Sequence, residues 1–372
     1  MSGRRTIAVT GAGGFVGRNL LLRLKETGRF DVVPILRDAT DQDWMERIGA
    51  ADAVVHLAGV NRPTDPAEFA TGNGGTAALL ADAVEAAGRP IPILYASSAK
   101  AVEPGVYGES KKAAEDVLLS LAERTGAPVA VYRLPNIFGK WCRPNYNSAV
   151  ATFCHNIARG LPIRIDNPAA PLTLVYIDDV IDAFISLLDA GAFATGFHVV
   201  APAYDSTVGA VAEIVRRFRD DRADNLIQNV GSGLIRALYA TYVSYLPPVE
   251  FSYPIASHRD PRGAFSEMLK TRDAGQFSYF NALPGVTRGG HYHHTKTEKF
   301  LIVHGEALFR FRHMLTGEVH EVRTSAEAPV VVETVPGWTH DVTNVGDGIM
   351  VSLLWANEIF DRQRPDTIAE KV

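Results

Sequence analysis

The sequence contains very little cysteine. Only Cys142 and Cys154 occur among 372 residues, too few for a disulfide framework and typical of proteins from reducing compartments. Long apolar runs are also missing, since no stretch approaches the roughly 18 to 20 apolar residues that span a bilayer. The N-terminus lacks the apolar core and the cleavage site of a signal peptide. We therefore expect a cytoplasmic protein without a membrane partner.

An excess of charge of one sign is missing as well. The formal net charge is −5 and the pI is near 6.1, which argues against a protein that binds nucleic acid through phosphate contacts. The histidines, in contrast, are unevenly distributed. Of the 11 in the chain, 3 precede residue 250 and 8 follow it. This imbalance predicts two regions with different chemistry.

Short apolar runs alternate with helical patterns in the first 200 residues. Such alternation is typical of an α/β protein with a parallel sheet and helices on both faces. Helices are expected at 18–27 and 109–124, where apolar residues recur at spacings of three and four. The expected strands are 6–10, 32–36, 53–57, 92–96 and 129–134.

The pattern changes after about residue 245. Prolines break the helical periodicity, and short β-rich runs separated by glycine-containing turns follow at 300–303, 307–312, 330–335 and 349–355. Many short strands with such turns predict a small all-β barrel or sandwich. We therefore expect one domain at residues 1–246 and a second at residues 247–372.

A glycine-rich turn follows the first expected strand and opens a helix. The G-x-x-G-x-x-G spacing suits a dinucleotide, whose pyrophosphate must approach bare backbone at a helix N-terminus. About 20 residues later the second strand ends in Arg37 and Asp38. Arginine at this place would hold the 2′-phosphate of NADP and a carboxylate the ribose of NAD; Arg37 comes first, so NADP(H) is favoured. The candidate cofactor contacts are Gly11, Gly14, Phe15, Val16, Gly17 and Arg37.

A Y-x-x-x-K pair lies at Tyr107 and Lys111. Four-residue spacing puts both side chains on one face of a helix, so the ammonium can lower the pKa of the phenol. Such a tyrosine can exchange a proton with a substrate carbonyl while hydride moves. Ser97 and Ser98 close the preceding strand, and either hydroxyl can polarise the same carbonyl.

Over the first 240 residues the chain resembles an extended short-chain dehydrogenase/reductase (SDR) of the sugar-nucleotide type. The matching segments are 10–17, 56–59, 97–98, 107–111, 133–139 and 175–180. The resemblance implies a Rossmann-like, doubly wound parallel sheet and catalytic roles for Tyr107, Lys111 and Ser98, with Ser97 as the alternative serine. It also implies further cofactor contacts from Lys111 and the Ala58-Gly59 backbone. Two departures stand out: serine and tyrosine are only nine residues apart, and 99–101 lacks the acid pair of the family's dehydratases, so a dehydratase is disfavoured.

The C-terminal region carries a second constellation, His291, His293, Glu298 and His340. On a strand, His291 and His293 point to the same face. Glu298 can join them from the next strand and His340 from a later hairpin. Three imidazoles and a carboxylate suit a divalent transition metal with an open position for substrate. Zinc is the first expectation, and iron, manganese and nickel remain alternatives.

This segment resembles the cupin barrel. Its two motifs match at His291, His293, Glu298 and Gly305, and at Pro336, Gly337, His340 and Asn344. Segment 288–292 also resembles the part of 4-keto sugar-nucleotide epimerases that carries a catalytic histidine. His291 is therefore either a metal ligand or the base.

Nearly the full length resembles the bifunctional capsular-polysaccharide enzymes. The resemblance implies a homodimer that epimerises C3 of a UDP-2-acetamido-2,6-dideoxy-hexos-4-ulose in a zinc-binding cupin domain. The SDR domain then reduces the 4-keto group with NADPH, on the way to UDP-N-acetyl-L-fucosamine. Two other interpretations stay open: a sugar-nucleotide 4-epimerase that retains NAD and carries an accessory cupin, and a non-catalytic sensor that binds NADP and metal.

Overall fold

The computed structural model describes residues 4–223, 225–255, 257–260, 263–266, 269–271, 275–358 and 363–372. The chain forms two compact units. The first contains residues 1–138, 146–148 and 172–206, and the second contains 139–145, 149–171 and 207–372. No helix in the described part of the chain is long and apolar enough to span a membrane.

The first unit is built on six parallel strands in the order β2-β1-β3-β4-β5-β8. From β1 the chain moves outward to β2 and then returns to the other side of β1 with β3. This reversal of strand order creates a switch point, the usual ligand site of such sheets. The strands are β1 (Arg5–Thr10), β2 (Phe30–Ile35), β3 (Ala53–His56), β4 (Ile93–Ser98), β5 (Val129–Leu134) and β8 (Gly196–His198).

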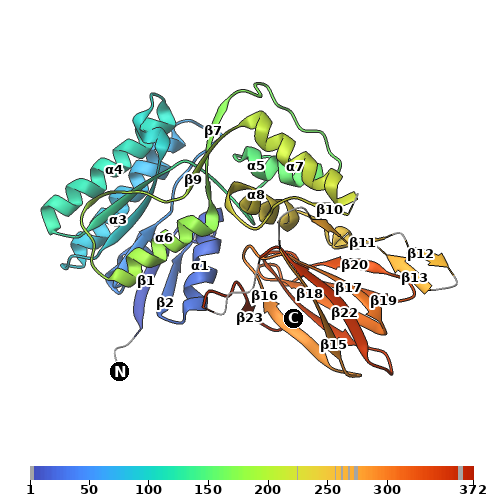
Figure 1. Cartoon of the computed structure of the whole chain (residues 1–372). Helices are drawn as coiled ribbons and strands as arrows, with labels where there is room; N and C mark the ends of the chain where they lie inside the picture. Colours follow the sequence, from blue (N-terminus) through green and yellow to red (C-terminus); the bar gives the residue numbers. More distant parts are fainter. Residues whose placement is uncertain are drawn as a thin grey trace. The chain divides into compact units, whose positions relative to one another are not determined.

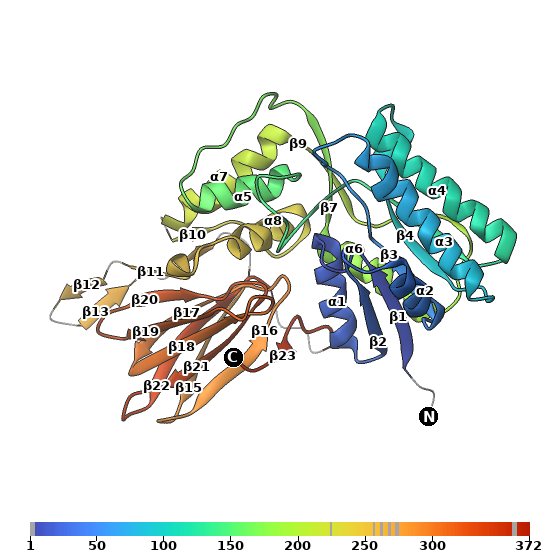
Figure 2. The same cartoon turned by 180° about the vertical axis from the view of Figure 1, so that it is seen from behind.

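Helices cover both faces of this sheet, so the doubly wound α/β prediction is confirmed. Helices α1 (Phe15–Thr27) and α6 (Ile177–Ala190) pack against each other (Figure 1). Figure 2 shows α2 (Asp41–Gly49), α3 (Thr76–Ala86) and α4 (Val106–Thr125) beside one another. Their apolar residues form a buried core with the strands. A π-helix η1 (Ala70–Gly75), a 3₁₀ turn η2 (Ala99–Val102) and a small sheet of β6 (Asn136–Phe138), β7 (Pro171–Tyr176) and β9 (Ala203–Thr207) complete the unit.

The second unit combines three helices with the β-rich region. The helices α5 (Ala149–Ala158), α7 (Val208–Ala223) and α8 (Gly233–Ser244) pack on one another. One five-stranded sheet has the order β11-β20-β17-β22-β15 and the other β19-β18-β21-β16-β23. The strands of the first sheet are β11 (Ser252–Pro254), β15 (Gln276–Ala282), β17 (Glu298–His304), β20 (Val330–Glu333) and β22 (Met350–Ala356). Those of the second are β16 (Thr287–Tyr292), β18 (Glu306–His313), β19 (Val319–Ser325), β21 (Trp338–Asn344) and β23 (Ile368–Ala369). Shorter pieces are β10 (Leu226–Ile227), η3 (Pro248–Glu250), β12 (Ser257–Asp260), β13 (Gly263–Ser266) and β14 (Lys270–Thr271).

Neighbouring strands in these two sheets pair antiparallel. On β18, Ala307, Phe309 and Phe311 are buried in alternation with more exposed residues, as expected of a strand with one face on a core. The all-β prediction for this region is confirmed, and a closed cupin barrel stays a prediction.

The helices and the β-rich region of the second unit share a buried ionic contact. Glu333 of β20 is fully buried and pairs with Arg222 of α7 at 3.1 Å and Lys299 of β17 at 2.6 Å. Tyr239 of α8 donates a hydrogen bond to the same carboxylate. Because a buried carboxylate is costly without such partners, this contact ties α7 and α8 to the strands. The expected boundary after residue 246 lies just beyond α8 and stays a prediction.

Candidate functional site

The glycine-rich turn leaves no room for side chains. Gly11 has a left-handed φ of +63°, and a Cβ added there would lie 2.7 Å from the Ala58 nitrogen. A Cβ on Gly17 would lie 2.5 Å from the Gly11 oxygen. Helix α1 begins at Phe15 with Gly14 as its N-cap, and glycine offers no side-chain acceptor. The first N–H groups of α1 are therefore available to an anionic ligand.

The segment after β3 lies against this turn. The Thr10 hydroxyl accepts hydrogen bonds from the backbone nitrogens of Leu57 and Ala58, each at 3.1 Å. A Cβ on Gly59 would lie 2.7 Å from Asn73 Oδ1. Asn73 is buried and holds Val60 through both its amide oxygen and its amide nitrogen. The structure thus brings the Ala58-Gly59 backbone to the switch point. Sequence analysis did not identify Asn73.

Arg37 lies in an exposed turn two residues after the end of β2. The backbone nitrogen of Ala12 donates to the Ile35 oxygen at 3.4 Å, so the end of β2 adjoins the glycine-rich turn. Phe15 and Val16 are half-buried in the first turn of α1. All the cofactor candidates in the first three strand–turn segments therefore follow the carboxyl ends of adjacent strands.

Ser98 and Tyr107 meet across a tight connection. Ser98 closes β4, accepts a hydrogen bond from the Lys100 nitrogen at 3.2 Å, and is hydrogen-bonded to the Tyr107 hydroxyl. The short η2 turn joins β4 to α4. A Cβ on Gly108 would lie 2.3 Å from the Lys100 oxygen, so the start of α4 packs directly on η2. This packing accommodates the nine-residue spacing between serine and tyrosine.

Lys111 is almost fully buried beneath Tyr107, with 6% of its surface exposed. Its Nζ donates to the Ala96 oxygen at 2.9 Å and lies 4.6 Å from the centroid of the Tyr95 ring. Burial lowers the pKa of Lys111 to about 8, against the opposing charge of Glu115. Burial also raises the pKa of Tyr107, and the hydrogen bond to Ser98 lowers it. Burial, rather than the lysine charge that we expected, thus has the largest effect on the phenol in this structure.

Ser97, the alternative serine, has a different partner. Its hydroxyl donates to Glu115 Oε1 at 2.5 Å. Glu115 is fully buried and pairs with Arg133 at 2.6 Å. Ser97 therefore belongs to a buried polar group between β4, β5 and α4, which sequence analysis did not foresee.

The four candidate metal ligands converge. Strand pairing sets His291, near the end of β16, opposite His340 of β21, and His293 and Glu298 follow in the next turn and at the start of β17. One nitrogen or oxygen from each residue lies within 4.8 Å of those of the others. Glu298 Oε2 is 3.2 Å from His293 Nε2 and 3.6 Å from His340 Nε2. His294 lies outside this set and contacts the Tyr292 ring.

The electrostatics of this cluster suit a cation. Burial lowers the pKa of His291 to about 3, with further contributions from His340 and His293, and burial also lowers the pKa of His340. Burial alone would raise the pKa of Glu298, but hydrogen bonding to its histidine neighbours and their charges hold it well below its usual range. Among the residues that the structure describes, the ring nitrogens of buried His340 make no hydrogen bond of ordinary length, and Nε2 lies 3.6 Å from Glu298 Oε2. Three imidazoles, two of them with lowered pKa values, and a buried carboxylate fit a divalent metal.

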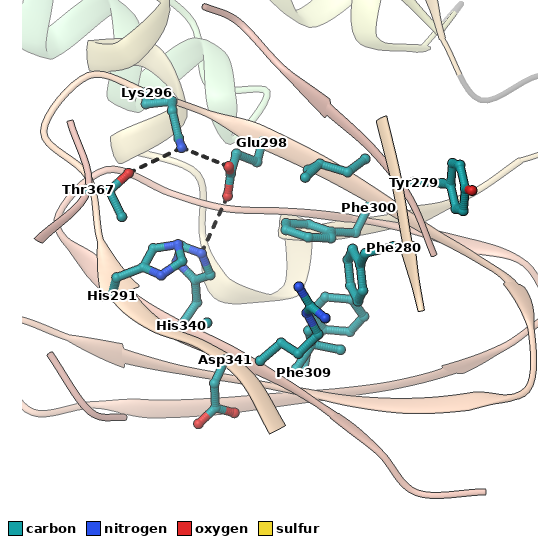
Figure 3. Close-up of a pocket in the computed structure, with 14 residues that line it drawn as sticks. Tyr279, Phe280, His291, Lys296, Glu298, Phe300, Phe309, His340, Asp341 and Thr367 are labelled. Atoms are coloured by element: carbon teal, nitrogen blue, oxygen red, sulfur yellow. Dashed lines mark hydrogen bonds and ion pairs between the residues drawn. The ribbon is translucent and has the colours of Figure 1, made fainter. Parts of the chain in front are cut away.

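A cavity of about 310 Å³ opens beside the cluster. Figure 3 shows His291, His340 and Glu298 on one side and the rings of Phe280, Phe300 and Phe309 on another. Lys296 also lines the cavity, with its Nζ 3.0 Å from Glu298 Oε1. An apolar wall next to converging polar groups is typical of a small-molecule site.

Comparisons with known proteins cover both regions. Residues 7–200 match the NAD dependent epimerase/dehydratase family, and residues 258–368 match the polysaccharide biosynthesis C-terminal domain. A Pseudomonas aeruginosa protein named UDP-2-acetamido-2,6-beta-L-arabino-hexul-4-ose reductase is 55% identical over 98% of each chain.

Solved structures of similar proteins also span the whole chain. The capsular polysaccharide assembling protein CapF from Staphylococcus aureus is 39% identical, with a TM-score of 0.68 over 98% of this chain and 100% of that one. CapF with the inhibitor 3-isopropenyl-tropolone is 36% identical, with a TM-score of 0.63 over 99% and 100%. The similarity therefore extends through both candidate sites.

Proposed function

Since the chain belongs to the NAD dependent epimerase/dehydratase family, we propose that it is a bifunctional sugar-nucleotide enzyme. The β-rich region epimerises C3 of a UDP-2-acetamido-2,6-dideoxy-hexos-4-ulose, and the α/β region reduces the 4-keto group with NADPH. The observation that carries the proposal is the presence of a serine–tyrosine–lysine site and a four-residue metal cluster in one chain that resembles a UDP-4-keto-sugar reductase along its length. The product would enter UDP-N-acetyl-L-fucosamine biosynthesis.

Reduction needs a hydride on C4 and a proton on the C4 oxygen. When bound, NADPH would supply the hydride and leave as NADP⁺; the Tyr107 hydroxyl gives the proton that turns the ketone into an alcohol. Ser98, bonded to Tyr107, orients the carbonyl oxygen. The charged Lys111 lies under the reacting groups and favours the phenolate that remains. Arg37 holds the 2′-phosphate, and the turn from Gly11 to Gly17 holds the pyrophosphate.

Epimerisation needs removal of the proton at C3, which is α to the ketone, and its return to the opposite face. A divalent metal, which we propose to be Zn²⁺, would stabilise negative charge on the C4 oxygen when bound. His291, His293, Glu298 and His340 would hold it, and we place His291 among the ligands because its ring centroid lies 4.8 Å from that of His340 and 5.0 Å from that of His293. The aromatic wall keeps water from the sugar ring.

The relatives support the chemistry of both steps. The P. aeruginosa protein is named for reduction of a 4-keto UDP-sugar. The inhibitor in one CapF structure is a tropolone, a class with adjacent carbonyl and hydroxyl oxygens that chelates divalent metals. We further propose that the β-rich region closes as a cupin barrel and that the enzyme is a homodimer.

The proposal is tested by mixing the metal-loaded protein with NADPH and a UDP-linked 4-keto-6-deoxy-HexNAc. Stoichiometric loss of NADPH absorbance is expected. Tightly retained NAD with no net NADPH consumption would instead indicate a 4-epimerase, and binding of NADPH without turnover of this substrate class would indicate a sensor.

A further inference from the structure

The end of the described chain lies beside the candidate metal ligands. Strand β23 pairs with β16, which sets Ala369 opposite His291 and Ile368 opposite Tyr292. The Glu370 nitrogen donates to the Gly290 oxygen at 2.9 Å. This pairing brings Asp366 and Thr367, which directly precede β23, to the turn that joins His293 to Glu298.

The Asp366 carboxylate binds the backbone of that turn. Its Oδ1 accepts from the His294 nitrogen at 2.9 Å, and its Oδ2 accepts from the nitrogens of Thr295 and Lys296 at 2.7 Å each. The Thr295 hydroxyl adds a fourth hydrogen bond at 3.0 Å. Charge-assisted hydrogen bonds to three consecutive N–H groups fix the turn more firmly than neutral acceptors would.

The backbone oxygen of Asp366 contacts a ligand directly. It lies 2.5 Å from His293 Nδ1. A carbonyl oxygen only accepts, so Nδ1 carries a proton, and Nε2 is the ring nitrogen that remains to ligate a metal in exchange for its own proton. It is Nε2 that faces Glu298 Oε2 at 3.2 Å. Asp366 thus selects the tautomer and the ring orientation that the cluster needs.

Thr367 acts on Glu298 through Lys296. The Lys296 ammonium donates to the Thr367 hydroxyl at 3.3 Å and lies 3.0 Å from Glu298 Oε1, and Figure 3 shows it between the two residues. This contact occupies one carboxylate oxygen and leaves Oε2 toward His293 and His340. A carboxylate held in this way ligates through one oxygen, which keeps a coordination position open for substrate.

We infer that Asp366 and Thr367 are positioning residues of the metal site: Asp366 orients His293 and the 294–296 turn, and Thr367 with Lys296 restricts Glu298 to one ligand oxygen. The inference rests on the metal-binding part of the proposed function. Groups that orient metal ligands typically change metal affinity by about 10- to 100-fold when removed. Neither residue ligates the metal in this assignment; Thr367 also lines the cavity.

The test measures Zn²⁺ affinity of the full chain by competition with a chromophoric chelator, and the visible absorption of the Co²⁺-substituted protein. Asp366→Asn keeps the shape of the side chain but removes its charge, and Thr367→Val removes the hydroxyl. Glu370→Gln is the matched control, because it removes a carboxylate from the same segment that pairs with Arg312 instead. We expect Asp366→Asn to weaken Zn²⁺ binding by about tenfold or more and to alter the Co²⁺ spectrum. A smaller change is expected for Thr367→Val, and none for Glu370→Gln.

Asp366→Asn with the wild-type affinity and Co²⁺ spectrum would overturn the inference while leaving the metal site in place. A wild-type protein that binds neither Zn²⁺ nor Co²⁺ would overturn the metal site together with the inference. A crystal structure of the wild-type protein with Zn²⁺ provides a test that no variant's folding can obscure. It should show His293 coordinated through Nε2 and Glu298 through one oxygen; coordination through Nδ1, or through both oxygens of Glu298, would contradict the assignment.

Discussion

The two candidate sites are built in opposite ways. In the α/β unit, the dinucleotide site consists of backbone that must remain bare, and a single methyl on Gly17 would collide with the Gly11 oxygen at 2.5 Å. In the β-rich region, the site consists of side chains that converge from three strands and a turn. The first site leaves bare backbone in contact with a large ligand, the dinucleotide. The second brings side-chain donor atoms together around a small ligand, the metal ion.

Their buried charges differ in the same way. The first site buries one cation, Lys111, whose charge is only partly opposed by Glu115 and whose pKa is therefore lowered to about 8. The second buries an anion, Glu298, among three imidazoles and Lys296. A buried cation beside a phenol serves proton transfer, whereas a buried anion among imidazoles serves cation binding. Because the two sites share no residue, damage to one site should leave the chemistry of the other intact.

Tyr107→Phe is expected to separate the reductase activity from the C3-exchange activity most strongly. Removing the proton donor should lower NADPH oxidation by about 10² to 10⁴-fold, while exchange of the C3 proton with solvent deuterium continues at the wild-type rate. Stopped-flow absorbance and NMR measure the two activities. Tyr132→Phe, which removes the hydroxyl of a buried tyrosine on β5, is the control. Unchanged NADPH turnover in Tyr107→Phe would contradict the reductase assignment.

Glu298→Ala should have the opposite effect: it should remove C3 exchange and leave reduction intact. Loss of the only carboxylate among the four converging groups should weaken metal binding by about 100-fold or more and abolish deuterium exchange at C3. Reduction of a 4-keto sugar that already has the inverted C3 should persist. Glu306→Ala, which removes an exposed carboxylate at the start of β18, should leave metal content unchanged. Metal analysis after dialysis provides the measurement, and full metal occupancy in Glu298→Ala would contradict the ligand set.

A smaller effect is expected from Arg37→Ala. Loss of a charge-assisted contact to the 2′-phosphate should weaken NADPH binding by about tenfold or more, because Arg37 follows the strand that adjoins the glycine-rich turn. NADH binding should not change, and neither should the metal site. Fluorescence titration with both nucleotides makes the comparison, and an equal loss for both would argue against NADP recognition by Arg37.

The smallest effect concerns pH. A Lys111 pKa of about 8 means that the ammonium is charged below pH 8 and neutral above it, so reduction should slow as pH rises through 8. Between about 8 and the ordinary lysine value near 10.4 the unfolded chain binds more protons, so this group makes folding more stable as pH rises, and unfolding cannot explain the loss. Rates from pH 6 to 9.5 test this, and a Lys111→Arg protein should lack the decline. A wild-type rate that is flat through pH 9 would contradict the role.

The sequence was informative where chemistry follows local spacing. The glycine turn, Tyr107 with Lys111, and His291 with His293 and Glu298 could be predicted, because each set is defined by short intervals or by strand alternation. His340 lies 42 residues after Glu298 and was predicted from a later hairpin and the cupin motif. Asp366 could not, since it acts on a turn about 70 residues away through backbone groups that leave no pattern. The buried position of Glu115 could not be predicted either, because nothing in the sequence shows that a carboxylate on a helix is buried. Helices α5, α7 and α8 join the β-rich unit through contacts such as Arg222 with Glu333, which hydrophobic periodicity does not report.

We propose that the two sites act on the same sugar. The most direct test of this proposal is NMR of the product formed from the UDP-linked 4-keto-6-deoxy-HexNAc with NADPH in D₂O. The expected product has a hydroxyl at C4 and one deuterium at an inverted C3. A reduced product with protium and the original configuration at C3 would contradict it.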